Sequence, residues 1–266
     1  MNPYLETLRP KQWYKNLLIF AGLFFTYNLF NLDLWLETIL VFFLFCLVVG
    51  GIYTLNDIHD MKEDRKNPKK KKTKPVASGK ISVSNAFFYS CVLLTYCAII
   101  VGFINPILFS ISLIYIIINL FYTLFFKKTP IVDVMMISSG FVIRLGIGYA
   151  LLNVMPNVWL ILSVFLIGMF LALKKRFHRQ KSYRYSENLL IFLMYMSSTL
   201  FLIAYGLFCL NIKNMIFTIP IVAITLCWFN NINQYKEQSI KLLRSKGVLL
   251  GLSIWGLMCL LILYVL

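Results

Sequence analysis

The sequence has 266 residues, 60% of them apolar, and a mean hydropathy of +0.78. Soluble domains are about 45–50% apolar, so this composition excludes an ordinary soluble enzyme and indicates a chain that lies in a membrane throughout. The formal net charge of +16 comes from 26 Lys and Arg against ten acidic residues. Such a surplus would suit a nucleic-acid-binding protein, but its distribution along the chain favours a membrane protein, and we expect no nucleic-acid partner.

Nine apolar segments are long enough to be read as membrane spans. They cover residues 14–31, 35–57, 83–103, 106–126, 131–152, 157–174, 188–209, 213–230 and 247–266. We therefore expect an all-α, polytopic membrane protein whose residues 1–266 form a single transmembrane domain. The six cysteines lie singly within apolar runs, so we interpret them as packing residues.

The basic residues are distributed very unevenly between the two sides of this predicted topology. The N-terminus and the even-numbered connections carry 24 of the 26 Lys and Arg. The two exceptions are Arg144, which lies within a span, and Lys213. Because cytoplasmic loops are enriched in Lys and Arg, the pattern predicts a cell (inner) membrane protein with its N-terminus in the cytoplasm.

An acidic cluster follows the second predicted span, at the cytoplasmic side. On a continuous helix, one face about 100° wide carries three carboxylates and an amide, those of Asn56, Asp57, Asp60 and Asp64. Carboxylates at these spacings repel one another, and a divalent cation removes that cost. Hard oxygen ligands suit Mg²⁺, which shares its coordination with waters and phosphates, so we predict a Mg²⁺ site formed by these four residues. A solvated helix end is the simpler interpretation.

Further polar residues are expected at the same membrane face. Asp133 begins the fifth span, and Lys175 and Arg176 end the sixth. Acidic residues surrounded by basic ones suit a phosphorylated substrate bound with Mg²⁺, because the metal ion and the basic side chains together neutralise a departing diphosphate. Each basic residue singly is also an ordinary cytoplasmic anchor of a span. Asn119 and Tyr122 lie about one turn apart and are candidates to line the same cavity.

Arg144 is the basic residue that lies at membrane depth. A lone arginine there costs at least about 2.5–3.5 kcal/mol unless it is paired. On a continuous helix it would share a face with Asp133 and lie about 16 Å deeper. Two interpretations stay open: it is bonded to carbonyls or small polar groups, or it reaches up to an anionic ligand.

The motif Asn56-Asp57-x-x-Asp60-x-x-x-Asp64 resembles the first aspartate-rich motif of the UbiA superfamily of intramembrane prenyltransferases. That resemblance implies nine transmembrane helices enclosing a cytoplasm-facing cavity and a Mg²⁺-dependent active site. Further segments resemble one branch of the superfamily, the decaprenyl-phosphate phosphoribosyltransferases. They are Arg9–Asn16, Asp64-Arg65 with Lys74–Gly79, Asn119–Tyr122 leading to Lys127, Asp133, and Ser139–Arg144.

The branch resemblance implies transfer of 5-phosphoribose from phosphoribosyl diphosphate to a polyprenyl phosphate, with release of diphosphate. The catalytic candidates are then Asp57, Asp60, Asp64 and Arg144. Contacts to the substrates are expected from Lys11, Lys15, Asn16, Asn56, Arg65, Lys74, Asn119, Tyr122, Lys127, Asp133, Lys175 and Arg176. A homo-oligomer is compatible with the sequence, which decides neither the oligomeric state nor the lipid chain length.

The sequence departs from the superfamily at one informative place. Typical members carry a second motif with two aspartates four residues apart, whereas here Asp133 stands between Thr129 and Ile137. The departure favours phosphoribosyl diphosphate over a prenyl diphosphate as the donor. The alternative is a prenyltransferase that joins a prenyl diphosphate to an aromatic or other acceptor. A third hypothesis, from a different class, is a transporter or lipid scaffold.

Overall fold

The computed structural model describes residues 2–177, 186–231 and 246–266. These residues are mainly helical, and none of them forms a strand. The chain divides into two compact units. We call Met1–Thr129 with Ile143–Met155 the first unit, and Pro130–Val142 with Pro156–Leu266 the second unit.

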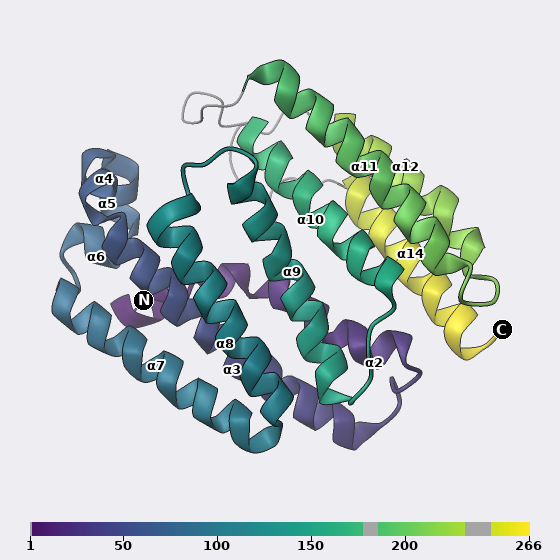
Figure 1. Ribbon diagram of the computed structural model, residues 1–266, viewed down its shortest axis with the longest axis horizontal. Coiled ribbons are helices and arrows are strands. Elements are labelled where there is room, and N and C mark those ends of the chain that lie inside the picture. The colour runs from purple at the N-terminus through teal and green to yellow at the C-terminus, as the bar shows by residue number, and fades with distance from the viewer. Residues whose placement is uncertain (1, 178–185, 232–245) are drawn as a thin grey trace. The chain divides into compact units, whose positions relative to one another are not determined.

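The first unit is built around three long helices. α3 (Leu32–His59), α7 (Val83–Ile104) and α8 (Pro106–Phe121) lie side by side (Figure 1). The shorter elements are α1 (Pro3–Thr7), the 3₁₀ helix η1 (Pro10–Phe20), α2 (Ala21–Phe25), α4 (Met61–Lys66), α5 (Pro68–Thr73), α6 (Pro75–Ser78) and the π-helical turn η2 (Tyr122–Phe126). The end of α9 (Val132–Leu151) also belongs to this unit.

Local sequence signals set the starts of these helices. The Ser82 hydroxyl accepts a hydrogen bond from the Asn85 amide at 3.2 Å and caps α7. Pro106 occupies the first turn of α8, where its missing N–H costs nothing, and Asn105 caps that helix. The core is formed where α3 meets its neighbours, around Phe45 and Leu108.

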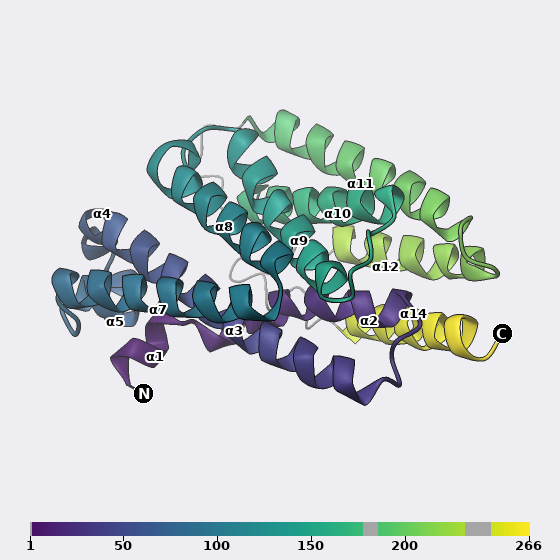
Figure 2. The ribbon, with the colours of Figure 1, turned by 60° about the horizontal axis from the view of Figure 1, so that its bottom comes forward.

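The second unit pairs α10 (Val158–Phe177) with α11 (Glu187–Cys209), and α12 (Ile219–Asn231) with α14 (Lys246–Tyr264). Both pairs are visible in Figure 2. A short 3₁₀ helix, η4 (Met215–Thr218), precedes α12. Phe170 and Phe229 form part of the core of the second unit, with their ring centroids 5.8 Å apart.

Seven of the nine predicted spans coincide with helices long and apolar enough to cross a membrane: α3, α7, α8 with η2, α9, α10, α11 and α14. The eighth predicted span is a shorter apolar helix over Met215–Asn230. The first, 14–31, is not one helix, because η1 and the five-residue α2 occupy it. Much of the predicted sixth and eighth connections lies outside the described residues. The full count of nine spans stays a prediction.

Two glycines let the first segment lie directly against α9. A Cβ added to Gly148 would collide with the carbonyl oxygen of Ile19, and one added to Gly22 would come within 2.5 Å of the Gly148 carbonyl oxygen. The two backbones are therefore in contact, as small residues permit between membrane helices. This contact holds η1 and α2 in place although neither is long enough to form a span.

Replacing Gly148 by Ala should destabilise the protein by about 1–3 kcal/mol, because the added methyl group would push the first segment away from α9. The matched control is Gly146→Ala on the same helix, where an added Cβ meets no atom within 4 Å. That variant should keep the wild-type unfolding midpoint or exceed it, since Ala favours helix. Thermal unfolding in detergent measures both, and equal midpoints for the two variants would contradict the close approach.

Candidate functional site

The acidic cluster lies at the junction between α3 and α4. α3 ends at His59, and Asp60 joins it to α4 with φ −82° and ψ −4°. Hydrogen bonds from the Asp60 amide to the Asn56 carbonyl (3.0 Å) and from the Asp64 amide to the Asp60 carbonyl (2.9 Å) keep the backbone close to helical. Asp57 and Asp64 consequently lie about two helical turns apart on the same side of the backbone, and their side chains are only 2% and 1% exposed.

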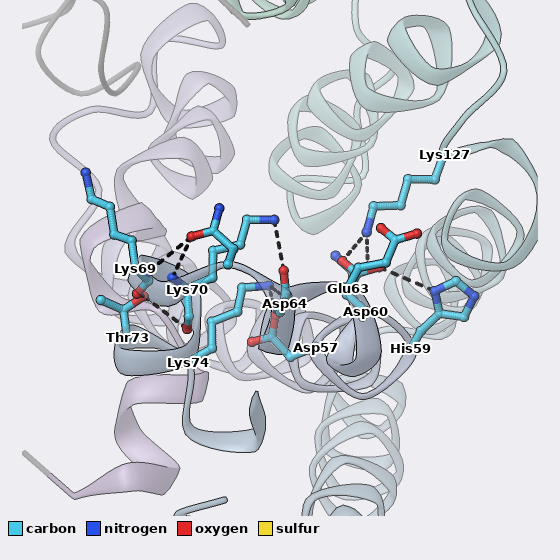
Figure 3. A network of polar contacts seen from close by, with 12 residues as sticks. Asp57, His59, Asp60, Glu63, Asp64, Lys69, Lys70, Thr73, Lys74 and Lys127 are labelled. Carbon is cyan, nitrogen blue, oxygen red and sulfur yellow. Dashed lines mark hydrogen bonds and ion pairs between the residues drawn. The ribbon is translucent and has the colours of Figure 1, made fainter. Parts of the chain in front are cut away.

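One lysine joins the two buried carboxylates. Lys74 Nζ donates to Asp57 Oδ1 at 2.7 Å and to Asp64 Oδ2 at 2.5 Å (Figure 3). Arg9 donates to Asp57 Oδ1 at 2.5 Å, and Lys70 Nζ donates to Asp64 Oδ1 at 2.8 Å. Each buried carboxylate therefore has two cationic partners, as buried charges require.

The packing of two short segments positions these cations. Lys74 directly precedes α6, whose residues Val76 and Ala77 are buried and anchor the segment. Arg9 adopts a left-handed backbone conformation (φ 50°, ψ 59°), and its guanidinium lies 4.6 Å from the ring centroid of Tyr53. The cation–π contact and the ion pair together direct this side chain toward the carboxylates.

The other polar side chains of the cluster accept hydrogen bonds from two different lysines. Lys127 Nζ donates to Asn56 Oδ1 at 3.0 Å and to Asp60 Oδ2, and Figure 3 shows it approaching from the side opposite Lys74. Lys128 Nζ donates to Glu63 Oε1 at 2.5 Å, and this pair is exposed.

The predicted face of four metal ligands is therefore divided into two pairs, Asp57 with Asp64 and Asn56 with Asp60. In the part of the chain that the structure describes, no three acidic, His or Cys side chains converge closely enough to hold a metal ion. The physical reason is that like-charged carboxylates separate and each pair takes its own ammonium group. The role of these four residues as metal ligands stays a prediction.

Neighbouring lysines favour the ionised form of Asp64 and of Glu63. Burial by itself would raise the pKa of Asp64, but hydrogen bonds from Lys70 and Lys74 and their positive charges outweigh it and hold the pKa below its usual value. The hydrogen bond from Lys128 lowers the pKa of Glu63 in the same direction. Asp64 and Glu63 are therefore ionised at neutral pH and already paired with lysines.

The donor set fits a divalent cation chemically. Carboxylate and amide oxygens are ligands that Mg²⁺ prefers, and Mg²⁺ requires only one or two carboxylates beside waters and phosphates. The Lys74 ammonium group shows that the buried oxygens of Asp57 and Asp64 already share one positive charge. A pair of such carboxylates, rather than a preformed cage, is what this structure offers to a metal ion.

Arg144 lies in a cage of aromatic and polar groups in the first unit. Its Nε donates to Asn16 Oδ1 at 2.7 Å, and one of its terminal nitrogens donates to the Tyr115 hydroxyl at 2.8 Å. Its guanidinium carbon is 5.0 Å from the ring centroid of Tyr115 and 5.6 Å from that of Phe45. Of the two interpretations left open by the sequence, the contacts favour small polar groups. A role for Arg144 in catalysis stays a prediction.

Two further predicted site residues pair with each other in the second unit. Arg176 Nε donates to Asp133 Oδ2 at 2.7 Å, and the side chains are 3% and 1% exposed. Nearby in the chain, the buried Lys174 donates to the carbonyl oxygens of Phe229 and Asn230 at the end of α12. Lys174 thus caps a helix C-terminus, where a cation is favoured.

The other basic residues predicted to contact substrate lie on three elements, with Lys11 and Lys15 on η1, Arg65 on α4 and the half-buried Lys175 on α10. Lys11 is exposed on η1, and Lys15 donates to Gln12 Oε1 at 3.2 Å. Arg65 Nε donates to the Ala77 carbonyl oxygen at 3.3 Å, which ties α4 to α6. The structure therefore gives Arg65 a supporting role in placing the segment that follows Lys74.

Three cations that contact the acidic side chains, Arg9, Lys70 and Lys128, were not among the residues predicted to bind substrate, although Arg9 begins a segment that carries the family resemblance. Lys70 belongs to a run of four lysines that differ only in how the chain folds there, so no sequence signal distinguished it. Asn119 and Tyr122, both predicted to line a cavity, lie at the end of α8 and the start of η2, where Asn119 donates to the Tyr115 carbonyl oxygen at 2.8 Å.

Comparison with known proteins identifies relatives over most of the chain. The sequence profile of the UbiA prenyltransferase family matches residues 17–246. The decaprenyl-phosphate phosphoribosyltransferase of Mycolicibacterium smegmatis is 27% identical over 223 residues, which cover 76% of this chain and 69% of that protein. The enzyme of the same name from Corynebacterium glutamicum is 29% identical over 180 residues, which cover 65% of this chain and only 53% of that protein.

Solved structures share the fold. A UbiA homolog from Archaeoglobus fulgidus bound to DMAPP and Mg²⁺ matches with a TM-score of 0.76 and 19% identity, over 100% of both chains. The same homolog bound to GPP and Mg²⁺ gives a TM-score of 0.74 and 20% identity, over 98% of this chain and 97% of that one. At such identities the likeness concerns the fold.

A double-mutant cycle should show strong coupling between Asp133 and Arg176. Asp133→Asn and Arg176→Gln should each cost about 3–5 kcal/mol, because each leaves a buried charge without its partner, and the double variant should cost less than the two combined. Unfolding in mixed micelles measures the free energies.

The control cycle uses the exposed pair Glu63 and Lys128, whose side chains are 64% and 77% exposed. It should show next to no coupling, because solvent screens surface ion pairs. Additive effects at Asp133 and Arg176 would contradict the buried pair.

Proposed function

Since the chain belongs to the UbiA prenyltransferase family, we propose that it moves 5-phosphoribose from phosphoribosyl diphosphate to a polyprenyl phosphate and releases diphosphate. The family and its named relatives identify the chain as a transferase enzyme, and its apolar helices make it a multi-pass membrane protein. The names of the Mycolicibacterium and Corynebacterium relatives support the choice of substrates. The observation that carries the proposal is the contact of Lys74 with the two buried carboxylates of Asp57 and Asp64, beside further cations.

The same proposal includes the finer architecture. The whole chain would form one UbiA-like domain with nine crossing segments around a cavity, and the family match supports this because it extends through both units. The N-terminus and the acidic cluster would face the cytoplasm of the cell membrane, since the basic connections lie on that side.

Two pairs of residues would hold the metal ion, Asp57 with Asp64 and Asn56 with Asp60. When bound, Mg²⁺ would neutralise charge on the diphosphate as it departs. Around it, the cationic side chains would bind the phosphates of the donor and orient its anomeric carbon; the candidates are Lys11, Lys15, Arg65, Lys74 and Lys127. Asp60 is bonded to Lys127, so this lysine is already positioned beside one metal ligand.

The acceptor needs little activation. An oxygen of the lipid phosphate is already anionic, so it can attack the anomeric carbon as the bond to diphosphate breaks, without a strong general base. Arg144 or Lys175 would orient the lipid phosphate. The apolar helices would hold the polyprenyl chain and exclude water, which would otherwise hydrolyse the donor.

A prenyltransferase acting on an aromatic or other acceptor is the second candidate. The observation that favours it is the fold match to a homolog solved with the prenyl diphosphates DMAPP and GPP. The two candidates share a diphosphate leaving group and therefore differ only in the donor's organic part and in the acceptor.

Purified protein with Mg²⁺, labelled phosphoribosyl diphosphate and polyprenyl phosphate should yield labelled lipid. Chelation of Mg²⁺ should abolish the product, and Asp57→Asn or Asp64→Asn should lower the rate by at least about 100-fold, because electrostatic stabilisation of the leaving group is lost. Extraction and chromatography of the lipid measure the product.

The matched control is Glu63→Gln, a neighbouring acid that is exposed and pairs with the exposed Lys128. This variant should keep activity close to that of the wild type. Prenyl transfer from a prenyl diphosphate, with no labelled lipid from phosphoribosyl diphosphate, would contradict the proposal and support the second candidate.

A further inference from the structure

Lys74 lies between the two buried carboxylates of the acidic cluster. Its ammonium group lies between Asp57 Oδ1 and Asp64 Oδ2, at 2.7 and 2.5 Å. Those are the two most deeply buried carboxylates of the cluster, while the Lys74 side chain is 21% exposed. Lys74 is therefore the more solvent-accessible partner in this arrangement.

The neighbouring cations behave differently. Lys70 is 53% exposed and contacts only the other oxygen of Asp64. Arg9 contacts Asp57 and is held over the Tyr53 ring. Among these three cations, Lys74 alone bridges both carboxylates, so it alone occupies the place that a shared metal ion would need.

The charge balance of the cluster also favours joint binding of a metal ion and an anionic donor. Four acidic side chains, Asp57, Asp60, Glu63 and Asp64, meet five cationic ones, Arg9, Lys70, Lys74, Lys127 and Lys128. The cluster is thus already neutralised without metal, and adding Mg²⁺ by itself would bring like charges together at short range. Adding Mg²⁺ together with an anionic diphosphate restores the balance.

We propose that Lys74 is an exchangeable counterion, which occupies the metal position between Asp57 and Asp64 in the metal-free protein and passes to the donor's phosphates when the metal enters. This inference rests on the proposed function, since it takes a metal and a diphosphate donor as given. Lys127, which bridges Asn56 and Asp60, has the same arrangement at the second pair.

The exchange couples the two ligands. Metal binding alone has to displace Lys74 and leave its charge without a partner, whereas a bound diphosphate supplies that partner. Metal and donor therefore bind more tightly together than apart, and by linkage each strengthens the other equally. If Lys74 only stabilised the fold, its removal would lower the affinity of the protein for both the metal ion and the donor.

The test compares Mn²⁺ binding by Lys74→Gln and the wild type, measured by electron paramagnetic resonance without donor. The variant should bind Mn²⁺ at least about tenfold more tightly, because the competing positive charge is gone. Its affinity for phosphoribosyl diphosphate at saturating Mn²⁺ should fall, since one phosphate contact is lost. Lys74→Arg should resemble the wild type in Mn²⁺ binding.

The matched control is Lys70→Gln, which removes a lysine from the same acid without emptying the bridging position. Its Mn²⁺ affinity should change much less than that of Lys74→Gln. Unchanged or weaker Mn²⁺ binding by Lys74→Gln would overturn the exchange.

A second measurement uses the wild type and does not depend on the folding of any variant. Lysine acylation read by mass spectrometry should show Lys74 protected without metal, more reactive with Mn²⁺, and protected again when donor is added. Lys128, bonded to the exposed Glu63, should not respond. Constant reactivity of Lys74 would overturn the exchange.

The outcomes also separate this inference from the proposed function. If the wild type binds no Mn²⁺ even with phosphoribosyl diphosphate present, the proposed metal-dependent function itself fails. If metal and donor both bind but Lys74→Gln leaves Mn²⁺ affinity unchanged, only the exchange fails.

Discussion

The burial of Asp57 and Asp64 is the constraint on which the first unit depends. Two carboxylates about two turns apart on one side of a helical backbone repel each other, and burial deprives them of the water that would screen them. Cations must come to them, and the three that do are carried by separate segments: Arg9 before η1, Lys70 on α5 and Lys74 before α6. The acids therefore determine where the N-terminal segment and the loop after α4 lie. The proposed site for an anionic substrate is assembled from the same cations that satisfy the buried negative charge.

At Arg144 the buried charge is positive rather than negative. It is a buried cation that meets the neutral Asn16 and Tyr115 side chains and the faces of two aromatic rings. Hydrogen bonds to neutral acceptors and cation–π contacts spread the positive charge without adding a carboxylate at membrane depth. Because Asn16 belongs to η1, the same contacts tie the irregular first segment to α8 and α9. The close approach at Gly148 reinforces that tie.

The sequence predicted the architecture well where a single physical rule dominates. Long apolar runs gave seven helices of spanning length, because the bilayer leaves no other way to satisfy their backbone groups. The rule failed for 14–31, where contacts to Arg144 and Gly148 hold a 3₁₀ helix that hydropathy cannot detect. The helix wheel predicted one face for Asn56, Asp57, Asp60 and Asp64, whereas the structure divides them into two pairs at the junction of α3 and α4. It could not place the lysines that make this division, because Lys74 and Lys127 are carried by separate segments of the chain.

The same reasoning explains why the predicted site contains so many lysines bonded to its own acids. A transferase that binds both a metal ion and a polyanion needs clustered charge of both signs. Before the substrates arrive, either sign alone would be costly to bury, and together they neutralise each other. Ion pairs of this kind contribute little net stability, since desolvation offsets much of the attraction. In the proposed exchange, the pairs would hold both sets of groups in place until substrates replace one partner with another. The difference in exposure between the buried aspartates and Lys74 suits that proposal, because the partner that would move is the one on the flexible, more accessible side chain.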